Sequence, residues 1–489
     1  MTEHSILVID EGTTSTRAML FGAEGTCLAV EQRELRQDYP RPGWVEHDAE
    51  EIWSASLACA RAMVEAGSGP GRIAALGITN QRETIVFWGR RTGRALAPAI
   101  VWQDRRTADL CARLKAEGRE EEVQAKTGLL LDPYFSASKI AWALEHWPQL
   151  REAGADLCVG TVESWLVFRL TGGLHVSDAT NASRTALMDI GAGRWDPGLL
   201  DLWGVPASAL PEIVDCAGDF GETLAEHFGA AIPIAGLAGD QQAAAIGQAC
   251  LTPGNTKATY GTGAFILANT GAECRRSRHR LLSTIAWQLG GERRYALEGS
   301  VFVAGSLIKW LRDDLALLGT AAETEALARS VPDSGGVQIV PGHSGLGAPW
   351  WRPDARGAIL GLSFATGRAH VARAALEAQA HQTHDLMTAF AADGAPWEVL
   401  KIDGGMASND WLAQDLADML GLTVERPRFV ETTALGAAML AGVGCGMFAS
   451  LEAAAAIRGE VERFEPAMAA GVREARLAGW KKAVEAVLG

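Results

Sequence analysis

The sequence is short of positive charge. Its 489 residues include 44 lysines and arginines against 59 aspartates and glutamates, which gives a net charge of −15. Nucleic acids and anionic membrane surfaces are bound by clustered Lys and Arg side chains. The deficit therefore argues against nucleic acid or a membrane surface as a partner. A small phosphorylated ligand is not excluded, because it needs only a local site.

Patterns for disulfides, zinc and secretion are also missing. The eight cysteines are scattered along the chain, and no C-x-x-C pair occurs among them. Scattered cysteines without zinc-type spacing are typical of thiols in a reducing compartment. The opening residues, MTEHSILVID, carry no basic segment ahead of an apolar run. We therefore expect no signal peptide and a cytoplasmic protein without insertion into a membrane.

Long hydrophobic runs are rare. The stretch 432–451 has no charged residue, but it consists mostly of alanine and glycine. Because this stretch has few large apolar side chains, we expect it to form a helix packed against a close neighbour rather than a membrane span. No linker rich in proline or serine divides the chain, yet single cores stop growing near ~250–300 residues. We therefore expect two α/β domains, 1–245 and 246–489, since strand-like and helical runs alternate throughout.

The segment LVIDEGTTSTRAMLF, residues 7–21, sets two strand-like runs around an acidic, hydroxyl-rich turn. Glycine in such a turn lets backbone N–H groups converge on phosphate oxygens, and Ser and Thr hydroxyls add donors. The common motif G-x-x-x-x-G-K-[ST] is absent, so the binding mode would differ from a P-loop. Asp10 is a candidate Mg²⁺ ligand and Arg17 a candidate phosphate partner. The alternative is a plain surface turn.

Two more glycine-rich turns follow strand-like runs. NTKATYGTGAFILAN, residues 255–269, repeats the strand-turn-strand pattern about half a chain later. In EVLKIDGGMASND the strand ends before Gly404 and Gly405, and a helix is predicted from Asn409 onward. The repetition predicts duplicated domains. Three such turns together predict a cleft between the domains that holds ATP.

Two polar segments interrupt apolar runs in the first half of the chain. GITNQRETIVFW places Arg82 and Glu83 between strands, where they can satisfy neighbouring hydroxyls of a polyol or form a strand-end salt bridge. AGLAGDQQAAAIGQ places Asp240 before a helix, as a proton acceptor for a substrate hydroxyl or as a simple N-cap. Nearby aromatic residues can wall a small polyol or belong to the core: Trp102, Tyr134 and Phe135.

Taken together, these segments resemble the FGGY family of carbohydrate kinases, and within it the members that phosphorylate glycerol. The matching motifs run in family order from DEGTTSTR, PGWVEHD and GITNQRET through IVWQDRRT, DPYFSASK, TNASRT and AGDQQAA to TYGTGAF, SGLGAPWW, DGGMASND and TALGAA. The resemblance implies an α/β fold of two actin-like, ribonuclease-H-type ATPase domains around a central cleft. It also implies Mg²⁺-dependent transfer of the ATP γ-phosphoryl group to glycerol, giving sn-glycerol 3-phosphate, by a homodimer or homotetramer.

The resemblance also implies roles for individual residues. The set that would bind glycerol is Arg82, Glu83, Trp102, Tyr134, Asp240, Gln241 and Phe265, with Asp240 also as general base. The set that would hold the nucleotide is Thr13, Thr14, Ser15 and Arg17 at the β- and γ-phosphates, and Thr262, Gly305, Lys309, Gly405 and Asn409 elsewhere. Asp10 would lie at Mg²⁺.

Three features depart from the family pattern. Glu11 stands where glutamine is usual, and a carboxylate beside phosphate is unfavourable unless it turns away or joins the metal shell. Lys309 also replaces a common glutamine, and its charge either helps to bind phosphate or points to water. AEHFGAAIPIAG lacks the loop that binds fructose 1,6-bisphosphate in some members, and His227 lies one residue from a phosphorylated histidine of others. We expect neither form of regulation.

Other functions remain open from the sequence. Another FGGY kinase, acting on erythritol or a pentulose, would need a larger pocket. A chaperone or filament protein of the actin superfamily would share the nucleotide cleft but not motifs that continue to about residue 440. A degenerate binding protein would bind the ligands without turnover.

Overall fold

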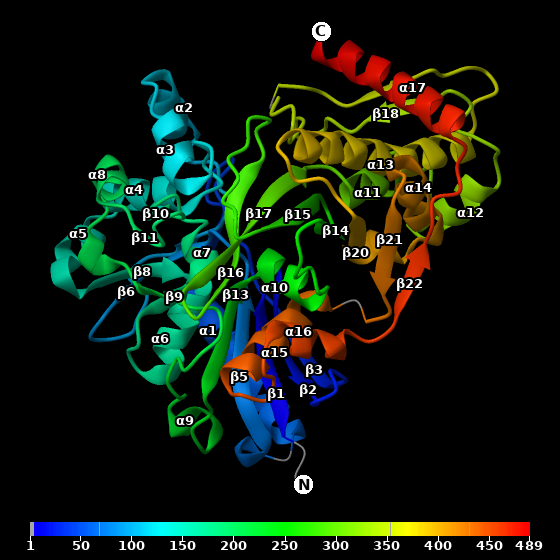
Figure 1. The fold of residues 1–489 in the computed structure, drawn as a ribbon. Helices are drawn as coiled ribbons and strands as arrows, with labels where there is room; N and C mark the ends of the chain where they lie inside the picture. Colours follow the sequence, from blue (N-terminus) through cyan, green and yellow to red (C-terminus); the bar gives the residue numbers. More distant parts are fainter. Residues whose placement is uncertain (1–3, 68, 353, 430) are drawn as a thin grey trace.

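The computed structural model describes residues 4–67, 69–352, 354–429 and 431–489. Two large sheets form its centre (Figure 1). The first has the order β13-β5-β1-β2-β3 and comprises β1 (Ser5–Glu11), β2 (Ser15–Phe21), β3 (Cys27–Glu34), β5 (Ile73–Asn80) and β13 (Ile234–Gly239). The second has the order β16-β17-β15-β14-β20-β21-β22 and comprises β14 (Asn255–Tyr260), β15 (Ala264–Gly271), β16 (Leu282–Leu289), β17 (Glu292–Val301), β20 (Val399–Asp403), β21 (Thr423–Pro427) and β22 (Val461–Phe464).

The two sheets share one topology. In the first, β1, β2 and β3 form an antiparallel meander, and β5 and β13 extend it from β1 as parallel strands. In the second, β14, β15 and β17 form the meander, and β20 and β21 extend it from β14 in parallel. The strands predicted on either side of the two turns are confirmed as β1–β2 and β14–β15. The repeated topology confirms the predicted duplication.

Helices from both halves of the chain fill the space between these sheets (Figure 1). Helix α10 (Asp240–Gly247) contacts β14, β15 and β16 of the second sheet, and α15 (Thr432–Gly444) lies on β1, β5 and β13 of the first. The approach of α15 is close, because a Cβ added at Gly77 of β5 would lie 2.6 Å from the Ala437 carbonyl oxygen. The helix predicted against a close neighbour is confirmed, and its small residues permit this packing.

Other helices cover the outer faces of the large sheets. Helix α1 (Ala49–Ala66) packs on β2 and β3, and α13 (Arg368–Ala392) packs on α14 (Asp410–Leu420). The second half also contains α11 (Gly305–Asp313), α12 (Glu323–Arg329), α16 (Leu451–Ala454), α17 (Ala470–Leu488) and the strand pair β18 (Gln338–Val340) and β19 (Ala358–Leu360). The predicted boundary near residue 245 lies within α10, and the helix α15 from the second half completes the layer above the first sheet.

A smaller lobe gathers beside the first sheet (blue through cyan to green, at the left of Figure 1). Its four-stranded sheet has the order β4-β7-β6-β8 and comprises β4 (Glu46–His47), β6 (Ile85–Gly89), β7 (Ala99–Ile100) and β8 (Leu157–Thr161). Around it lie α2 (Ala108–Ala116), α3 (Glu120–Thr127), α4 (Ser136–His146), α5 (Pro148–Ala153), α6 (Val162–Thr171), α7 (Ala179–Ala182), α8 (Pro197–Trp203) and α9 (Ala225–Phe228). Short strands complete it: β9 (Val176–Asp178), β10 (Met188–Asp189), β11 (Arg194–Trp195) and β12 (Glu212–Val214).

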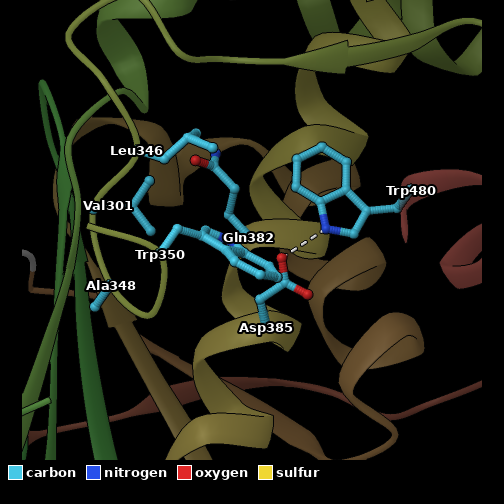
Figure 2. A pocket seen from close by; sticks show the side chains of 8 residues that line it. Val301, Leu346, Ala348, Trp350, Gln382, Asp385 and Trp480 are labelled. Carbon is cyan, nitrogen blue, oxygen red and sulfur yellow. Dashed lines mark hydrogen bonds between the residues drawn. The ribbon is translucent and has the colours of Figure 1, made fainter. Parts of the chain in front are cut away.

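The C-terminal helix α17 is anchored by a partly buried polar contact. The indole N–H of Trp480 donates to Oδ2 of Asp385 on α13 at 2.7 Å, beside Trp350 and Gln382 (Figure 2). Burial raises the pKa of Asp385 to about 6. Among the described residues, no helix is both long enough and apolar enough to span a bilayer.

Candidate active site

The first glycine-rich turn joins β1 to β2 at the edge of the cleft between the sheets. The Gly12 N–H donates to the Ser15 carbonyl at 3.0 Å and closes the turn. The hydroxyl of Thr13 accepts a 2.9 Å hydrogen bond from the Trp102 indole, and Thr14 is exposed at the tip. The turn therefore presents hydroxyl and backbone groups beside an aromatic side chain, as a phosphate site requires.

Asp10 and Arg17 face each other across this hairpin. They are partners in the β1–β2 register, and Arg17 Nη2 lies 3.0 Å from Asp10 Oδ2. Arg17 Nη1 also lies 2.6 Å from Glu431, just before α15. Burial raises the pKa of Asp10 to about 6, Arg17 opposes the rise, and the charges of Asp240 and Glu431 add to it. The negative charges of Asp240 and Glu431 thus disfavour ionisation of Asp10, and a divalent cation bound to Asp10 would oppose that effect.

The donor set suits a hard, partly hydrated cation. Within the ranges that the structure describes, no cluster of three His, Cys, Asp or Glu side chains could hold a metal unaided. Mg²⁺ is usually bound through one or two carboxylates together with waters and substrate phosphates. Asp10, with Asp240 close enough to influence its charge, fits that mode of binding.

Glu11 points away from the turn. Its side chain is fully buried, and Oε2 accepts a 2.8 Å hydrogen bond from the Ser56 hydroxyl on α1. Burial raises the pKa of Glu11 to about 8. At neutral pH the side chain is therefore mostly a neutral acid facing the core. The conflict with phosphate that the sequence raised does not arise.

The polar segment between β5 and β6 is buried beside Asp240 and Tyr134. Arg82 is buried, with Nε 3.2 Å from Asp240 Oδ1 and Nη2 3.4 Å from the Tyr134 hydroxyl. Glu83 is buried beside it and has φ of +62°, a conformation that non-glycine residues adopt rarely. The structure thus brings Arg82, Glu83 and Asp240 together, as predicted, rather than leaving the Arg-Glu pair as an exposed salt bridge.

Aromatic side chains from both halves of the chain gather beside these charged groups. The ring of Trp102 lies 5.6 Å from that of Tyr134 and 6.2 Å from that of Phe265 on β15, both edge to face. Trp102 also reaches Thr13 in the phosphate turn. Trp102 therefore links the β1–β2 turn to the group around Arg82 and Asp240. Phe135, by contrast, is buried in the core of the small lobe.

Asp240 is the first residue of α10. Its side chain is 33% exposed, whereas its partner Arg82 is almost fully buried. Oδ1 accepts from the Gln241 N–H at 2.7 Å, and Oδ2 accepts from the Gln241 side chain at 3.3 Å. The carboxylate thus combines a cap-like contact with open access to the cleft. The Gln241 side-chain oxygen in turn accepts from Lys257, a buried residue of β14.

Three glycine-rich segments converge on the other side of the cleft. The Gly305 N–H donates to the Gly261 carbonyl at 2.9 Å, and the Thr262 carbonyl accepts from Ala304 and Ser306. A Cβ at Gly404 would lie 2.5 Å from the Tyr260 carbonyl oxygen, so this turn packs on the end of β14. The turns at 261–263 and 404–405 and the start of α11 therefore meet, as a nucleotide site would require.

The remaining predicted nucleotide residues occupy different environments. A Cβ at Gly405 would meet no atom within 4 Å, so the backbone there is open to a ligand. Asn409 caps α14 by accepting from the Leu412 N–H at 3.0 Å, and its amide donates to Thr324 at 3.2 Å. Lys309 is exposed on α11.

Comparison with known proteins shows the family to which the chain belongs. Residues 5–247 match the N-terminal domain of the FGGY family of carbohydrate kinases, and residues 256–445 match its C-terminal domain. The chain belongs to the FGGY family of carbohydrate kinases. A glycerol kinase of Rhodospirillum rubrum is 56% identical over 99% of this chain and 98% of its own. A glycerol kinase of Alcanivorax borkumensis is 55% identical over the same shares.

Solved structures agree with this assignment. The crystal structure of Plasmodium falciparum glycerol kinase with ADP superposes with a TM-score of 0.95, at 36% identity over 100% of this chain and 99% of that one. A xylulose kinase of Rhodospirillum rubrum superposes at 0.87, with 26% identity over 99% of each chain. This FGGY carbohydrate kinase is thus an enzyme with the predicted two-domain, actin-like ATPase fold.

Some residues around the kinase pockets were not predicted as site residues. Arg184, Glu298 and Lys257 are buried charged groups next to predicted ones. Arg184 lies in the motif TNASRT, which supports the family resemblance but did not predict a role for this arginine. The available signal was a single charged residue within an otherwise uncharged run, as in YALEGSVF and NTKATYGTG. Such a residue is costly to bury unless it is paired.

Proposed function

We propose that this kinase transfers the γ-phosphoryl group of ATP to a terminal hydroxyl of glycerol, forming sn-glycerol 3-phosphate and ADP. The observation that carries the proposal is the contact of Arg82 with Asp240 beside the aromatic group of Trp102, Tyr134 and Phe265, of which Trp102 also bonds to Thr13 in the β1–β2 turn. Charged groups at one side and aromatic faces at the other suit a three-carbon polyol. The glycerol kinases among its relatives support the same acceptor.

In this mechanism Asp240 accepts the proton of the attacking hydroxyl. The hydroxyl oxygen then bonds to the γ-phosphorus while the bond to the β,γ-bridging oxygen breaks, and ADP leaves. Arg82 and Glu83 orient the acceptor with Tyr134 and Gln241, because a guanidinium donates to hydroxyl oxygens and a carboxylate accepts from hydroxyl hydrogens.

The nucleotide would be held by groups from both domains. Backbone and hydroxyl groups at Thr13, Thr14 and Ser15, with Arg17, face the β- and γ-phosphates. Bound Mg²⁺ would neutralise phosphate charge, and Asp10 would hold it directly or through water. In the second half of the chain the nucleotide site comprises Thr262, Gly305, Lys309, Gly405 and Asn409, which lie in turns and in or at the start of helices beside the second sheet.

A coupled ADP-release assay with and without glycerol tests the proposal. We expect ADP release that requires both glycerol and Mg²⁺, and glycerol 3-phosphate as the product. Asp240→Asn should lower kcat by about 10²- to 10⁴-fold, the usual contribution of an aligned general base, with a smaller change in KM for glycerol. Wild-type kcat in this variant would remove Asp240 from its role.

The same assay separates the proposal from its alternatives. An erythritol or pentulose kinase would show a higher kcat/KM for those acceptors than for glycerol. A chaperone or filament ATPase would release ADP equally fast without any acceptor. A degenerate binding protein would bind ATP and release no ADP.

A further inference from the structure

Four buried charges lie under the acceptor pocket. They are Arg82, Glu83, Arg184 and Glu298, and each side chain is at most 2% exposed. Glu298 accepts from both arginines, at 2.6 Å from Arg82 Nη1 and 2.8 Å from Arg184 Nη2. Arg184 Nε donates to Glu83 at 2.7 Å. The four groups therefore form one connected network.

The network joins the two halves of the chain. Arg82, Glu83 and Arg184 come from the N-terminal domain, whereas Glu298 lies on β17 of the second sheet. Arg82, Glu83 and Arg184 together carry one net positive charge in the interior, and the carboxylate of Glu298 balances it. Burial by itself would raise the pKa of Glu298, but Arg184 and Arg82 outweigh it and hold that pKa at about 2.

The contacts determine how Arg82 and Glu83 are oriented. Both terminal nitrogens of Arg82 donate to Glu298, at 2.6 and 3.3 Å, so Glu298 fixes the orientation of the guanidinium plane. Its remaining Nε faces Asp240 at 3.2 Å. Glu83 is held by Arg184 through Oε1 and by Ser136, whose hydroxyl donates to the Glu83 carbonyl at 3.0 Å. A bidentate pair of this kind adds geometric precision as well as energy.

We propose that Arg184 and Glu298 are positioning residues for the acceptor, which orient Arg82 and Glu83 across the domain boundary. This inference rests on the proposed function, because it takes Arg82 and Glu83 as the groups that bind the acceptor hydroxyls. Without Glu298, the two terminal nitrogens of Arg82 would lose the carboxylate that fixes the guanidinium plane, and the group would no longer be held in one orientation towards the acceptor and Asp240. Neither Arg184 nor Glu298 would contact the reacting atoms.

The alternative is that Arg184 and Glu298 only stabilise the fold. Variants that keep or break the charge balance of the network distinguish this alternative from a positioning role. Removing one partner of a buried pair leaves the other charge uncompensated and destabilises the fold. Replacing both partners by apolar residues of similar volume is often neutral or stabilising. The double variant Arg184→Met/Glu298→Met should therefore restore stability but not the orientation of Arg82 and Glu83.

The experiment measures steady-state kinetics and thermal melting for Glu298→Gln and for the double variant. We expect Glu298→Gln to lower Tm and to raise KM for glycerol by about 10- to 100-fold, because misplaced binding groups cost that much. KM for ATP should not change. In the double variant Tm should recover while KM for glycerol stays raised. A wild-type KM for glycerol in the double variant would overturn the inference, even where the single variant fails to fold.

A matched control removes a buried ion pair elsewhere. Asp415 of α14 pairs with Arg476 of α17 at 2.5 Å and is 4% exposed, so Asp415→Asn should lower Tm and leave KM for glycerol unchanged. The wild-type chain is assayed in parallel with glycerol, erythritol and xylulose, and KM is compared for the acceptor it prefers. A preference for another acceptor would refute the proposed function, while the comparison of variants would still test the positioning pair.

Discussion

Replacing Glu11 with glutamine should stabilise the protein at neutral and alkaline pH. Glu11 is fully buried, Oε2 accepts from Ser56, and Oε1 has no hydrogen-bond partner among the described residues. Ionisation at high pH would therefore create a buried, poorly compensated charge. Glutamine has nearly the same shape, stays neutral at every pH, and keeps an oxygen for the Ser56 hydroxyl.

The magnitude follows from the raised pKa. Burial moves the pKa of Glu11 from 4.5 to about 8. The stability that this proton contributes is fully present below the unfolded-state pKa and is lost as the pH rises through the folded-state pKa. One pKa unit corresponds to about 1.4 kcal/mol, so between about pH 5 and about pH 9 the wild-type loses at most about 4 kcal/mol that Glu11→Gln retains.

Urea unfolding of both proteins across this pH range measures the effect. We expect the difference in the free energy of unfolding, variant minus wild-type, to grow with pH and to level off above about pH 8. Glu452→Gln, at an exposed position on α16, serves as the control and should follow the wild-type at each pH. Because Glu11 faces α1, KM for ATP should be unchanged in Glu11→Gln. A constant difference with pH, or a large change in KM for ATP, would refute the assignment of Glu11 as a buried neutral acid.

Two other substitutions test the packing of the nucleotide turn and of the last helix. Gly404 has φ of +87°, and an alanine Cβ there would lie 2.5 Å from the Tyr260 carbonyl, so Gly404→Ala should cost more than about 1 kcal/mol of stability, measured by urea unfolding. Gly405→Ala meets no atom within 4 Å and should keep the stability but raise KM for ATP, so equal melting of the two variants would contradict this account. Trp480→Phe removes the indole donor to half-buried Asp385 and should lower stability by about 1 kcal/mol with kcat unchanged, whereas a wild-type Tm would show that this contact contributes nothing.

Features that depend on neighbours in the chain were predictable from the sequence. The strands β1, β2, β14 and β15 and the turns between them follow from apolar runs interrupted by glycine and hydroxyl residues. The Ala- and Gly-rich helix α15 was expected to have a close neighbour, and it lies on the first sheet. Arg82, Trp102 and Asp240 were predicted as site residues from long motifs in family order. In the structure Arg82 contacts Asp240, and the ring of Trp102 packs against that of Tyr134.

The orientation of buried charges was not predictable in the same way. The sequence left open whether Glu11 would face phosphate, and it offered no reason to join Arg184 to Glu298, which are 114 residues apart. Their pairing needs β17 of the second sheet to lie beside the segment that follows α7, and the tertiary arrangement alone brings them within hydrogen-bond distance.

The sequence by itself thus determined the strands on either side of the two glycine-rich turns and the duplication of the sheets, because these depend on local patterning and on motifs. Only the tertiary structure decided which charges are paired, which are kept neutral and which remain open to a ligand. The physical reason is that the energy of a charge depends on its burial and on partners within a few ångströms, and those partners here come from distant parts of the chain.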